Sequence, residues 1–397
     1  MDHDILVSGG GIAGLTATAA FAQAGFNVIC VDPAKPVTVR DAQGADLRST
    51  AFLQPAHALL EEVGLWTRLA PHAQPLQIMR IIDAGGPEPE ARMSKEFDAA
   101  DISDHPFGWN LPNWLLRREM AAHLETLPNV TYKTGVGART LFTRTAEARV
   151  GLSDSTRVSA RLVIAADGRG SPMREAAGIN VSTTRFGQKA LAFAVTHETP
   201  HENVSTEIHR TGGPFTLVPL PDHEGRPSSA IVWMEEGPKA KALYEMSEDS
   251  FEVAMNTRSC GVLGLLKLAS QRTIWPIISQ HADRLSSERL ALIAEAAHVL
   301  PPIGAQGLNM SLSDIRALRD LAIARPEGLG DAAMLDAFHK ARFNDIRLRE
   351  AGITLLNQTS MLSAAPLRDA RAAALNALYS FAPLRKSIMQ MGLGAKG

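Results

Sequence analysis

The sequence lacks the residues on which several common classes of protein depend. Its 397 residues include only two cysteines, Cys30 and Cys260, which stand far apart and in no metal-ligand spacing. This scarcity argues against a disulfide framework and against a zinc site, and we predict no metal centre. Neither sign of charge is in excess, since 40 basic residues face 42 acidic ones. The balance gives no indication of a nucleic-acid partner.

Long hydrophobic runs are missing as well. Charged or polar residues interrupt the apolar stretches well before the ~18 residues that a membrane-spanning helix requires. The first residues run straight into a strand-like segment and a glycine loop, so no secretory signal is recognised. We therefore expect a cytoplasmic protein, with contact at a membrane surface left open.

The residues that are present suffice for a large core, because 45% of them are hydrophobic. The length suggests two domains, or one domain with a substantial insertion. The order of the patterns predicts an α/β protein in which an antiparallel sheet interrupts a parallel core and the chain ends in helices. The expected parallel strands are Asp4–Ser8, Asn27–Val31, Arg161–Ala166 and Leu290–Ala294, the expected helices are Ile12–Ala24, Leu111–Leu127 and most of the chain from Gln306 onward, and the expected antiparallel sheet covers residues 186–233.

Glycines follow the first expected strand in the pattern G-x-G-x-x-G. Gly9 permits a tight turn, Gly11 lets the backbone approach a pyrophosphate, and Gly14 lets the helix pack closely against the strand. The pyrophosphate is expected at the positive end of the helix, beside Gly11, Ala13 and Gly14. Asp32 ends the second strand, where its carboxylate can accept hydrogen bonds from ribose hydroxyls. This loop does not separate FAD from NAD, so on its evidence alone an NAD-dependent dehydrogenase stays open.

Two later segments each follow an expected strand and carry a motif of their own. Asp167–Arg174 has the sequence Asp-Gly-Arg-Gly-Ser-Pro-Met-Arg, and Ala294–Met310 contains Pro-Pro-Ile-Gly-Ala-Gln-Gly-Leu-Asn. Together with the first loop, they resemble the three fingerprints of the single-component flavin aromatic hydroxylases, the p-hydroxybenzoate hydroxylase group. The resemblance implies FAD as the cofactor and NADPH or NADH as a transient co-substrate. It also implies that Asp167 and Gly168 lie near the FAD and along the nicotinamide approach.

The resemblance implies that the third segment binds the flavin ribityl chain and passes under the isoalloxazine ring. A carboxylate at a strand end can accept hydrogen bonds from the ribityl hydroxyls. The Pro-Pro-x-Gly stretch makes a stiff turn that can lie against a flat ring. The helix that begins near Gly307 would direct free N–H groups at negative charge on the reduced flavin. No catalytic dyad of side chains is expected. The candidate ring-contacting residues are Pro302, Gly304 and Gln306, and the other candidate cofactor contacts here are Glu295, Gly307, Leu308 and Asn309.

Nearly the whole chain resembles a narrower group, the ubiquinone-biosynthesis FAD-dependent hydroxylases of the UbiH/UbiF type. The resemblance implies that Arg48 and Arg117 contact the diphosphate or ribityl region of FAD, while an ordinary surface or ion-pairing arginine is the alternative for each. It also implies that the stretch containing Gly213–Leu220 walls the substrate cavity. The stretches that carry the resemblance are Arg48–Leu53, Asn113–Arg117, Gly213–Leu220 and Ala382–Arg385.

The sequence departs from that group at the opening of the third segment. The group usually has Gly-Asp there, and this chain has Ala294-Glu295. Glutamate keeps the charge on a side chain one methylene longer. Alanine costs little unless the backbone at that position needs a positive φ. Weaker retention of FAD is therefore left open, whereas loss of the site is not expected.

The resemblance implies a Rossmann-like FAD-binding domain with an inserted antiparallel-sheet substrate domain and a helical C-terminus. Residues 1–75, 101–182 and 275–397 would form the FAD domain, and residues 76–100 and 183–274 the substrate domain. The implied reaction is hydroxylation of a polyprenyl phenol ring in ubiquinone biosynthesis, through a flavin C4a-hydroperoxide and with O2 and NAD(P)H. Two other functions stay open: a flavin-dependent reductase of the geranylgeranyl-reductase kind, and a non-catalytic flavin-binding component of a quinone-synthesis complex.

Several other residues permit two interpretations. His298 is a candidate base but is more typical of a fixed structural residue at a strand-to-loop bend. Trp233 and Trp275 either line the substrate cavity or pack in a core, and Met389 is expected to pack. The basic, apolar stretch Leu367–Met391 is either an interfacial helix or an ordinary packed one. The family implies peripheral contact with the inner membrane or a quinone-synthesis complex.

Overall fold

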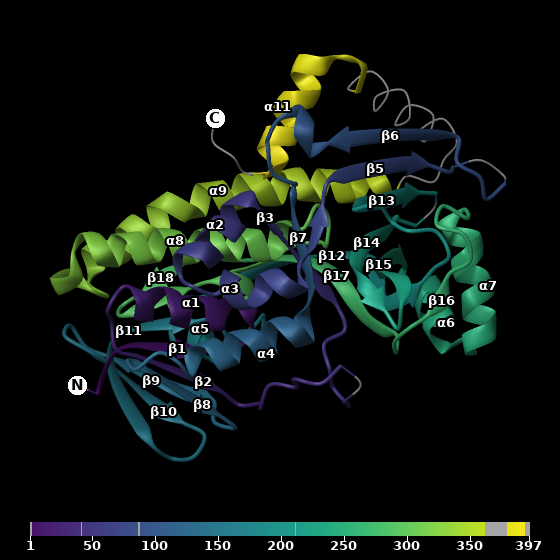
Figure 1. Cartoon of the computed structure of the whole chain (residues 1–397). Coiled ribbons are helices and arrows are strands. Elements are labelled where there is room, and N and C mark those ends of the chain that lie inside the picture. The colour runs from purple at the N-terminus through teal and green to yellow at the C-terminus, as the bar shows by residue number, and fades with distance from the viewer. Residues whose placement is uncertain (1, 41, 86–87, 211, 362–378, 394–397) are drawn as a thin grey trace.

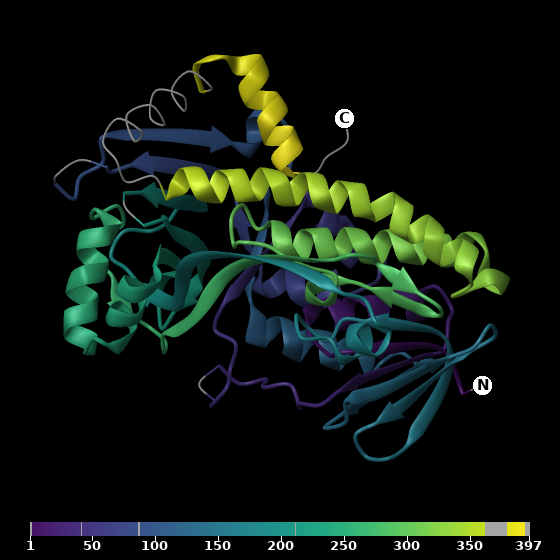
Figure 2. The same ribbon diagram turned by 180° about the vertical axis from the view of Figure 1, so that it is seen from behind.

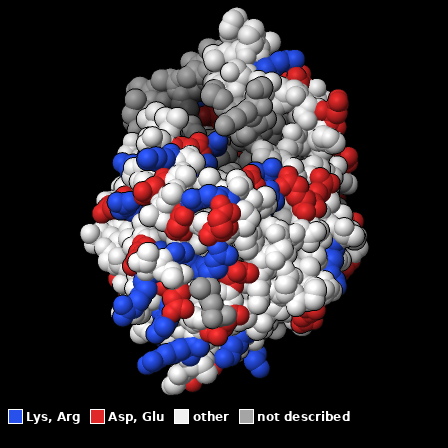
Figure 3. Space-filling view, turned by 90° about the vertical axis from the view of Figure 1, so that its left-hand side faces the viewer, with Lys and Arg blue, Asp and Glu red and all other residues white. Residues whose placement is uncertain are grey.

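The computed structural model describes residues 2–40, 42–85, 88–210, 212–361 and 379–393. Two large sheets and a layer of helices organise these residues (Figure 1). The first sheet lies on the side of the N-terminus, and the second lies on the opposite side of the molecule. On the face shown in Figure 3, basic and acidic side chains are interspersed, in keeping with the balanced charge of the sequence.

The first sheet has a parallel centre built from strands that are far apart in the sequence. Its order is β18-β19-β11-β1-β2-β8, and the neighbours from β19 to β8 run parallel. Strand β19, residues 28–31 of β2 and residues 5–7 of β1 are buried apolar runs, as expected of a parallel sheet that is covered on both faces. The strands are β1 His3–Ser8, β2 Val28–Asp32, β8 Val130–Thr134, β11 Arg157–Ala165, β18 Ser286–Ser287 and β19 Leu290–Leu292, with β9 Ala138–Thr143 and β10 Ala148–Leu152 as an antiparallel extension of β11.

Helix α1 (Ile12–Gln23) completes the predicted β-α-β unit. It is buried along nearly its whole length, because it contacts β2 as well as α4 (Asn113–Leu124) and α8 (Gln306–Ala324). Alanines and glycine dominate its sequence, and their small side chains let its neighbours approach from several directions. The remaining short helices are α2 Gln54–Glu62, α3 Trp66–Leu69 and α5 Pro172–Ala176.

The predicted helix Leu111–Leu127 was wrong at its start. Leu111 lies in β7 (Gly108–Pro112), where it pairs with Thr50 of β3 (Ser49–Leu53), and α4 begins only at Asn113. A short apolar run does not distinguish a strand from a helix, and here a partner strand far away in the sequence decides the outcome. The strand predicted as Leu290–Ala294 was two residues too long, because Ala294 adopts a positive φ of 54°.

The second sheet is antiparallel except for one parallel pair, β5 with β13. Its two faces differ. Leu191 and Phe193 point to the face covered by α6 (Gly237–Glu245) and α7 (Glu248–Ser259), whereas Ala190 points to the other face. The strands in spatial order are β20 His298–Val299, β17 Thr273–Ala282, β12 Val181–Thr196, β15 Arg226–Glu236, β14 Pro214–His223, β13 Val204–His209, β5 Ile78–Asp83 and β6 Met93–Asp98, with β16 Lys267–Leu268 beside β12.

Helix α9 (Ala332–Ser360) joins the two sheets by crossing both of them, as Figure 2 shows from behind. Its carboxylate Glu350 accepts a hydrogen bond of 2.6 Å from Ser279 Oγ on β17. Further along, Asn357 Nδ2 donates to Gln188 Oε1 on β12 at 2.9 Å. A third, small sheet consists of β3, β7 and β4 (Gln74–Leu76), whose strands all come from the part of the chain between β2 and β8. The predicted domain limits stay a prediction.

The C-terminal stretch is described only in part, because residues 367–378 of the predicted Leu367–Met391 helix lie outside the described residues. Helix α11 (Ala382–Leu393) is described, and its Met389 packs with Phe97 and Phe107, as predicted. Among the helices that the structure describes, none combines the length and the apolar character needed to cross a membrane.

Candidate functional site

The three motif segments meet at one edge of the first sheet. They follow β1, β11 and β19, which are parallel neighbours, so their carboxyl ends lie side by side. Backbone hydrogen bonds join the segments there: Ala166 N donates to Ser8 O at 2.8 Å, and Ile293 N donates to Ala165 O at 3.0 Å. The carboxyl edge of a parallel sheet is the place where α/β proteins bind nucleotides.

The three glycines of the G-x-G-x-x-G motif divide into two that are required by packing and one that faces open space. A Cβ on Gly9, whose φ is +109°, would lie 2.3 Å from Ala166 O, and one on Gly14 would lie 1.8 Å from Gly9 O. A Cβ on Gly11 would meet no atom within 4 Å. Gly11 is also the N-cap of α1, and no side chain caps that helix. The uncapped N–H groups and the open approach suit a pyrophosphate.

Asp32 lies beside this loop at the end of β2. Its Oδ2 accepts a hydrogen bond of 2.5 Å from Gly10 N, and its Oδ1 accepts one of 2.8 Å from Ala34 N. Tyr132 on β8 adjoins the same turn, since a Cβ on Gly10 would lie 2.7 Å from its hydroxyl oxygen. That hydroxyl is buried without a hydrogen-bond partner, and burial raises its pKa. The sequence reasoning missed Tyr132, because no local motif marks it.

Asp167 opens the second segment and is largely withdrawn from water. Its Oδ2 accepts from Ser8 Oγ at 3.1 Å and from Met173 N at 3.4 Å, while its Oδ1 is buried without a partner. Burial raises the pKa of this carboxyl above its usual value. The next residue, Gly168, has a φ of +85°, which a residue with a side chain rarely adopts.

Arg174 is a second residue whose role the sequence reasoning missed. Its side chain is 4% exposed and donates to Ala296 O at 3.0 Å and to Arg169 O at 2.9 Å. It therefore ties the second segment to the third. Its place at the end of the Asp167–Arg174 motif was visible, but the carbonyl that it reaches lies more than a hundred residues away.

The departure Ala294-Glu295 lies at the opening of the third segment. Ala294 has a φ of +54°, so this is a position where alanine is disfavoured relative to glycine. Glu295 is exposed, and it is one of the charges that raise the pKa of Arg48, after the larger effect of the hydrogen bond from Arg48 to Asp46. The carboxylate is therefore accessible just beyond the end of β19, and its contact with a ligand stays a prediction.

The ring loop, which we define as residues 299–305, leads from β20 into α8. Pro302 and Gly304 are exposed, and Ala305 is the N-cap of α8 with a φ of +55° and no side-chain capping bond. A Cβ on Gly307 would meet no atom within 4 Å, so the first turn of the helix is open. Leu308, in the same turn, is half-buried. These features leave N–H groups available at the helix start.

Asn309 is engaged by the protein itself. Its Oδ1 accepts from Leu53 N at 2.8 Å, and its Nδ2 donates to Ala51 O at 2.8 Å and to Ala305 O at 2.6 Å. The side chain therefore fastens α8 to β3. A contact between this side chain and a cofactor stays a prediction.

The two predicted arginines lie in different parts of the site. Arg48 donates twice to Asp46, at 2.8 and 2.7 Å, and its guanidinium stacks over Trp275 at 5.5 Å from the ring centroid. Arg117 on α4 is one of the charges that act on Tyr132, so it belongs to the region of Asp32. Arg48 is thus placed near the third segment and Arg117 near the first loop.

The ring loop also borders an apolar face of the second sheet. Ile303 packs with Ala190, Met234 and Ile277, and Trp275 belongs to the same cluster. Trp233 points to the opposite face, where it packs against Phe215 and Phe251. The structure thus separates the two tryptophans: Trp275 lies in the apolar cluster beside the ring loop, and Trp233 belongs to the core on the opposite face.

His298 is buried between strand β20 and helix α8. Its Nε2 lies 2.6 Å from Asp314 Oδ2, and its side chain is almost completely withdrawn from solvent. This arrangement supports the structural interpretation of His298 over that of a base for a substrate.

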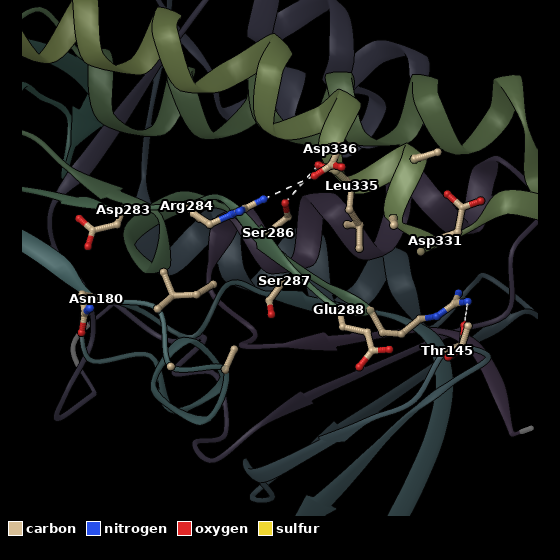
Figure 4. Close-up of a pocket in the computed structure, with 17 residues that line it drawn as sticks. Thr145, Asn180, Asp283, Arg284, Ser286, Ser287, Glu288, Asp331, Leu335 and Asp336 are labelled. Atoms are coloured by element: carbon tan, nitrogen blue, oxygen red, sulfur yellow. Dashed lines mark hydrogen bonds and ion pairs between the residues drawn. The ribbon is translucent and has the colours of Figure 1, made fainter.

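A cavity of about 840 Å³ lies elsewhere in the molecule and does not include any motif residue (Figure 4). It is lined by Arg289 and Ser287 at the amino end of β19 and by Asp331 at the start of α9. The motif segments lie at the carboxyl end of the same strand, so we do not assign the cavity to the site. Arg284, also in its lining, forms an ion pair with Asp336.

The residues at the carboxyl edge fit FAD. A pyrophosphate can approach Gly11 and α1, and a flat ring can approach the open start of α8. Two buried polar atoms without partners, Tyr132 Oη and Asp167 Oδ1, lie in segments beside this path. A dinucleotide carries both groups on one molecule, a pyrophosphate for the start of α1 and a flat ring for the start of α8.

Comparisons with known proteins agree with this assignment. Residues 2–347 match a family described as "FAD binding domain". Ubiquinone hydroxylase UbiL of Rhodospirillum rubrum is 31% identical over 394 residues, which are 98% of this chain and 89% of that protein. The 3-demethoxyubiquinol 3-hydroxylase of Escherichia coli is 26% identical, over 98% of both chains. In structure, p-nitrophenol 4-monooxygenase PnpA of Pseudomonas putida superposes with a TM-score of 0.80 at 18% identity, covering 100% of this chain and 99% of that one.

Proposed function

Because this chain belongs to the FAD binding domain family, together with the ubiquinone hydroxylases, we infer that it is an FAD-dependent aromatic-ring hydroxylase of ubiquinone biosynthesis. The single observation that carries the inference is the convergence of three distant segments at one sheet edge, beside an apolar face. We propose that its substrate is a phenol with a polyprenyl tail.

Bound FAD would supply the redox chemistry, with NADH or NADPH as the reductant and O2 as the source of the inserted oxygen atom. The chain's own residues bind and orient. Gly11 and the start of α1 are proposed to hold the pyrophosphate, Asp32 a ribose, and Glu295 the ribityl hydroxyls. The uncapped N–H groups at Gly307 and Leu308 are proposed to stabilise negative charge at the pyrimidine side of the ring.

The apolar face beside the ring loop is proposed to exclude water from the reacting ring. Met234 and Ile277 carry no polar hydrogen, Trp275 carries only its indole N–H, and Ile303 of the ring loop packs against this cluster. Water exclusion protects a reactive oxygen donor from unproductive decay. Among the ring-contacting candidates Pro302, Gly304 and Gln306, none carries an acid or base, which agrees with a mechanism without a side-chain dyad.

The direct test is substrate-dependent O2 consumption by the FAD-loaded protein with NADH or NADPH. We expect O2 uptake to be matched by a phenol that has gained one hydroxyl group, with water as the other product. A flavin-dependent reductase would instead give a product with one double bond fewer and no O2 uptake, and this result would overturn the proposal. Lipid extracts of a deletion strain should accumulate a prenylated phenol that lacks one hydroxyl group, which would name the step.

The matched control is Gly11→Glu. The new carboxylate would occupy the open approach at α1 and repel the pyrophosphate, so this variant should purify without flavin. Because no neighbour lies within 4 Å of a Cβ there, the fold should remain. A yellow Gly11→Glu protein would show that the nucleotide site is placed wrongly.

A polyprenyl substrate resides in a bilayer, so we also propose peripheral contact with a membrane or with a quinone-synthesis complex. Exposed apolar side chains on α9 and at α11 support this proposal, namely Leu355, Leu356, Phe381 and Leu384. Co-sedimentation with vesicles made from inner-membrane lipids tests it. Leu355→Ser combined with Leu356→Ser should reduce the bound fraction, and unchanged binding would remove this helix from the contact.

A further inference from the structure

One end of the ring loop is fastened by a buried histidine. His298 Nε2 lies 2.6 Å from Asp314 Oδ2 on α8, and Asp314 is completely buried. Arg342 on α9 donates from Nε to the other carboxylate oxygen of Asp314 at 2.7 Å. A buried carboxylate needs such partners, because an unpaired charge in the interior is strongly unfavourable. His298, α8 and α9 are thereby joined at a single carboxylate.

The same chain of contacts continues along α9 to the other end of the ring loop. Arg342 Nη1 donates to Asp345 Oδ2 at 2.7 Å, and Arg349 Nε donates to Asp345 Oδ1 at 3.1 Å. Arg349 Nη1 then donates to Gln306 Oε1 at 3.4 Å. Spacings of three and four residues place these three side chains on one face of the helix.

Gln306, at the start of α8, connects this chain of contacts to the ring loop. Its Nε2 donates to Gly304 O inside the ring loop at 3.0 Å, and to Gly392 O of α11 at 3.2 Å. The residue before the ring loop and the residue after it are thus connected through four charged side chains. Between them, Pro301 and Pro302 restrict the backbone, so fixing both ends leaves the loop little freedom.

We propose that His298, Asp314, Arg342, Asp345, Arg349 and Gln306 form one positioning network that holds both ends of the ring loop and so sets how the loop meets the isoalloxazine ring. The part of this proposal that concerns the flavin rests on the proposed function. The coupling of the two ends is a property of the chain itself. Gln306 lies in the proposed ring contact, and the other five are positioning residues that act through the loop.

The network makes a prediction that two independent anchors do not. His298, Asp314 and Arg342 are buried, and hydrogen-bonded charges in such an interior reinforce one another. Asp345 and Arg349 are half-buried and extend this group to Gln306, so loosening one end should weaken the other end as well. His298 and Arg349 lie at opposite ends and share no direct contact in the structure, although each is two steps from Arg342. If substitution of one of these two residues changes the other end of the loop, the effect is therefore transmitted through the charged side chains that lie between them.

The experiment compares His298→Ala, Arg349→Gln and the double variant, first without cofactor. Hydrogen exchange is followed at the amide of Val299, which lies in β20, and, separately, at the amide of Ile303, which donates to Pro301 O at 2.8 Å. We expect each single variant to speed exchange at both ends, on the order of tenfold, and the double variant to fall short of the product of the single effects. Arg349 is partly exposed, so its variant should fold even if His298→Ala does not.

Two further variants serve as controls. Arg349→Lys keeps a cation beside Asp345 and should restore slow exchange at the His298 end. Arg319→Gln removes an arginine of α8 that pairs with Glu62 and Asp320, outside the network, and should leave both ends unchanged. If Arg349→Gln speeds exchange only at Ile303 and leaves Val299 unchanged, the two ends are independent and the proposal is overturned.

The flavin part is read from the same variants loaded with FAD. We expect Arg349→Gln to change the visible spectrum of the bound flavin and to slow its reduction by NADH or NADPH about threefold, without a matching change in KM for the nucleotide. Coupled exchange with an unchanged spectrum and reduction rate would refute the flavin part and the assignment of the ring loop to the flavin. Failure of the network and failure of the proposed function are thus distinguishable, because the exchange measurement needs no cofactor.

Discussion

The first loop and the third segment both turn from a strand into a helix, but they solve the turn differently. In the first loop the close approaches are made by glycine: Cβ atoms on Gly9 and Gly14 would collide with backbone carbonyl groups. In the third segment two residues in the left-handed region are alanines, Ala294 and Ala305, with φ of 54° and 55°. A side chain in that conformation costs about 1–2 kcal/mol.

This difference separates positions where packing requires glycine from positions where alanine is tolerated. A side chain at position 14 would collide with the backbone of Gly9. Alanine is tolerated at positions 294 and 305 of the third segment, although its left-handed conformation is energetically unfavourable. The surrounding contacts supply the compensation: Arg174 holds Ala296 O, and Asn309 holds Ala305 O. Strained backbone persists where its surroundings determine the conformation, and such positions often lie at functional sites.

The largest expected effect comes from Gly14→Ala. Its Cβ would lie 1.8 Å from Gly9 O, so α1 must move away from β1, and we expect a loss of about 3 kcal/mol or more in the free energy of unfolding. Gly11→Ala is the matched control, with no atom within 4 Å of its Cβ, and should lose no more than about 1 kcal/mol. Urea denaturation of the two apo-proteins measures both. Equal losses would contradict the division of the loop into packing and approach positions.

The next effect concerns the two acidic residues at the strand ends. Glu295 is exposed, and we expect Glu295→Ala to weaken FAD binding about tenfold while leaving the unfolding free energy unchanged. Asp32 accepts hydrogen bonds from Gly10 N and Ala34 N, so Asp32→Ala should lower both FAD affinity and stability. Titration of apo-protein with FAD and urea denaturation separate the two outcomes. A Glu295→Ala protein with full FAD affinity would remove this carboxylate from the site.

The same contrast explains what the sequence could and could not predict. Buried apolar strands and glycine spacing are local patterns, so the β-α-β unit and the meeting of three motifs at one sheet edge were predictable. Contacts between distant residues were not. The bonds from Arg174 to Ala296 and from Asn309 to Leu53 depend on the assembled fold, as does the strand identity of Leu111, which Thr50 decides.

The positive φ of Ala294 lies between these cases. The sequence showed that alanine stands at position 294 where the family usually has glycine. Whether this alanine destabilises the backbone depends on its φ angle, which only the structure supplies. Likewise, the apolar character of Trp233 and Trp275 was visible, but the face of the sheet to which each points follows from the register of β12, β15 and β17. The sequence alone left them equivalent.

A smaller effect should follow from giving the third segment the glycines of the first loop. Ala305→Gly relieves a left-handed alanine and also improves an N-cap, because alanine is a poor capping residue. Glycine adds entropy to the unfolded chain, so the net gain in unfolding free energy should be about 0.5–1 kcal/mol. Ala294→Gly should gain a similar amount.

Thermal unfolding of the two apo-proteins measures these gains. Ala177→Gly, at a C-cap with a negative φ of −84°, is the control and should lose stability, since there glycine brings only its entropy cost. A loss in all three variants would show that the two left-handed alanines carry no strain.

The smallest effect is the pH dependence contributed by Asp167. Burial raises its pKa in the folded protein above the usual 3.8, so the folded state binds the proton more tightly than the unfolded chain. Stability contributed by this group is therefore present below the unfolded pKa and is lost as pH rises through the folded pKa. In Asp167→Asn the amide oxygen can still accept from Ser8 Oγ, and the amide nitrogen takes the place of the unpartnered Oδ1. The variant should gain stability relative to the parent as pH rises from 4, and the gain should level off above the folded pKa.

Asp154 gives the opposite sign, because hydrogen bonds from Lys133 and Thr156 lower its pKa in the folded protein. The parent protein therefore gains stability from Asp154 as pH rises from the folded pKa to the unfolded pKa. Asp154→Asn lacks this gain, so its stability relative to the parent should fall over the same pH range. Urea midpoints measured across acid and neutral pH compare the two, and a pH-independent difference for Asp167→Asn would show that this carboxyl titrates normally in the fold.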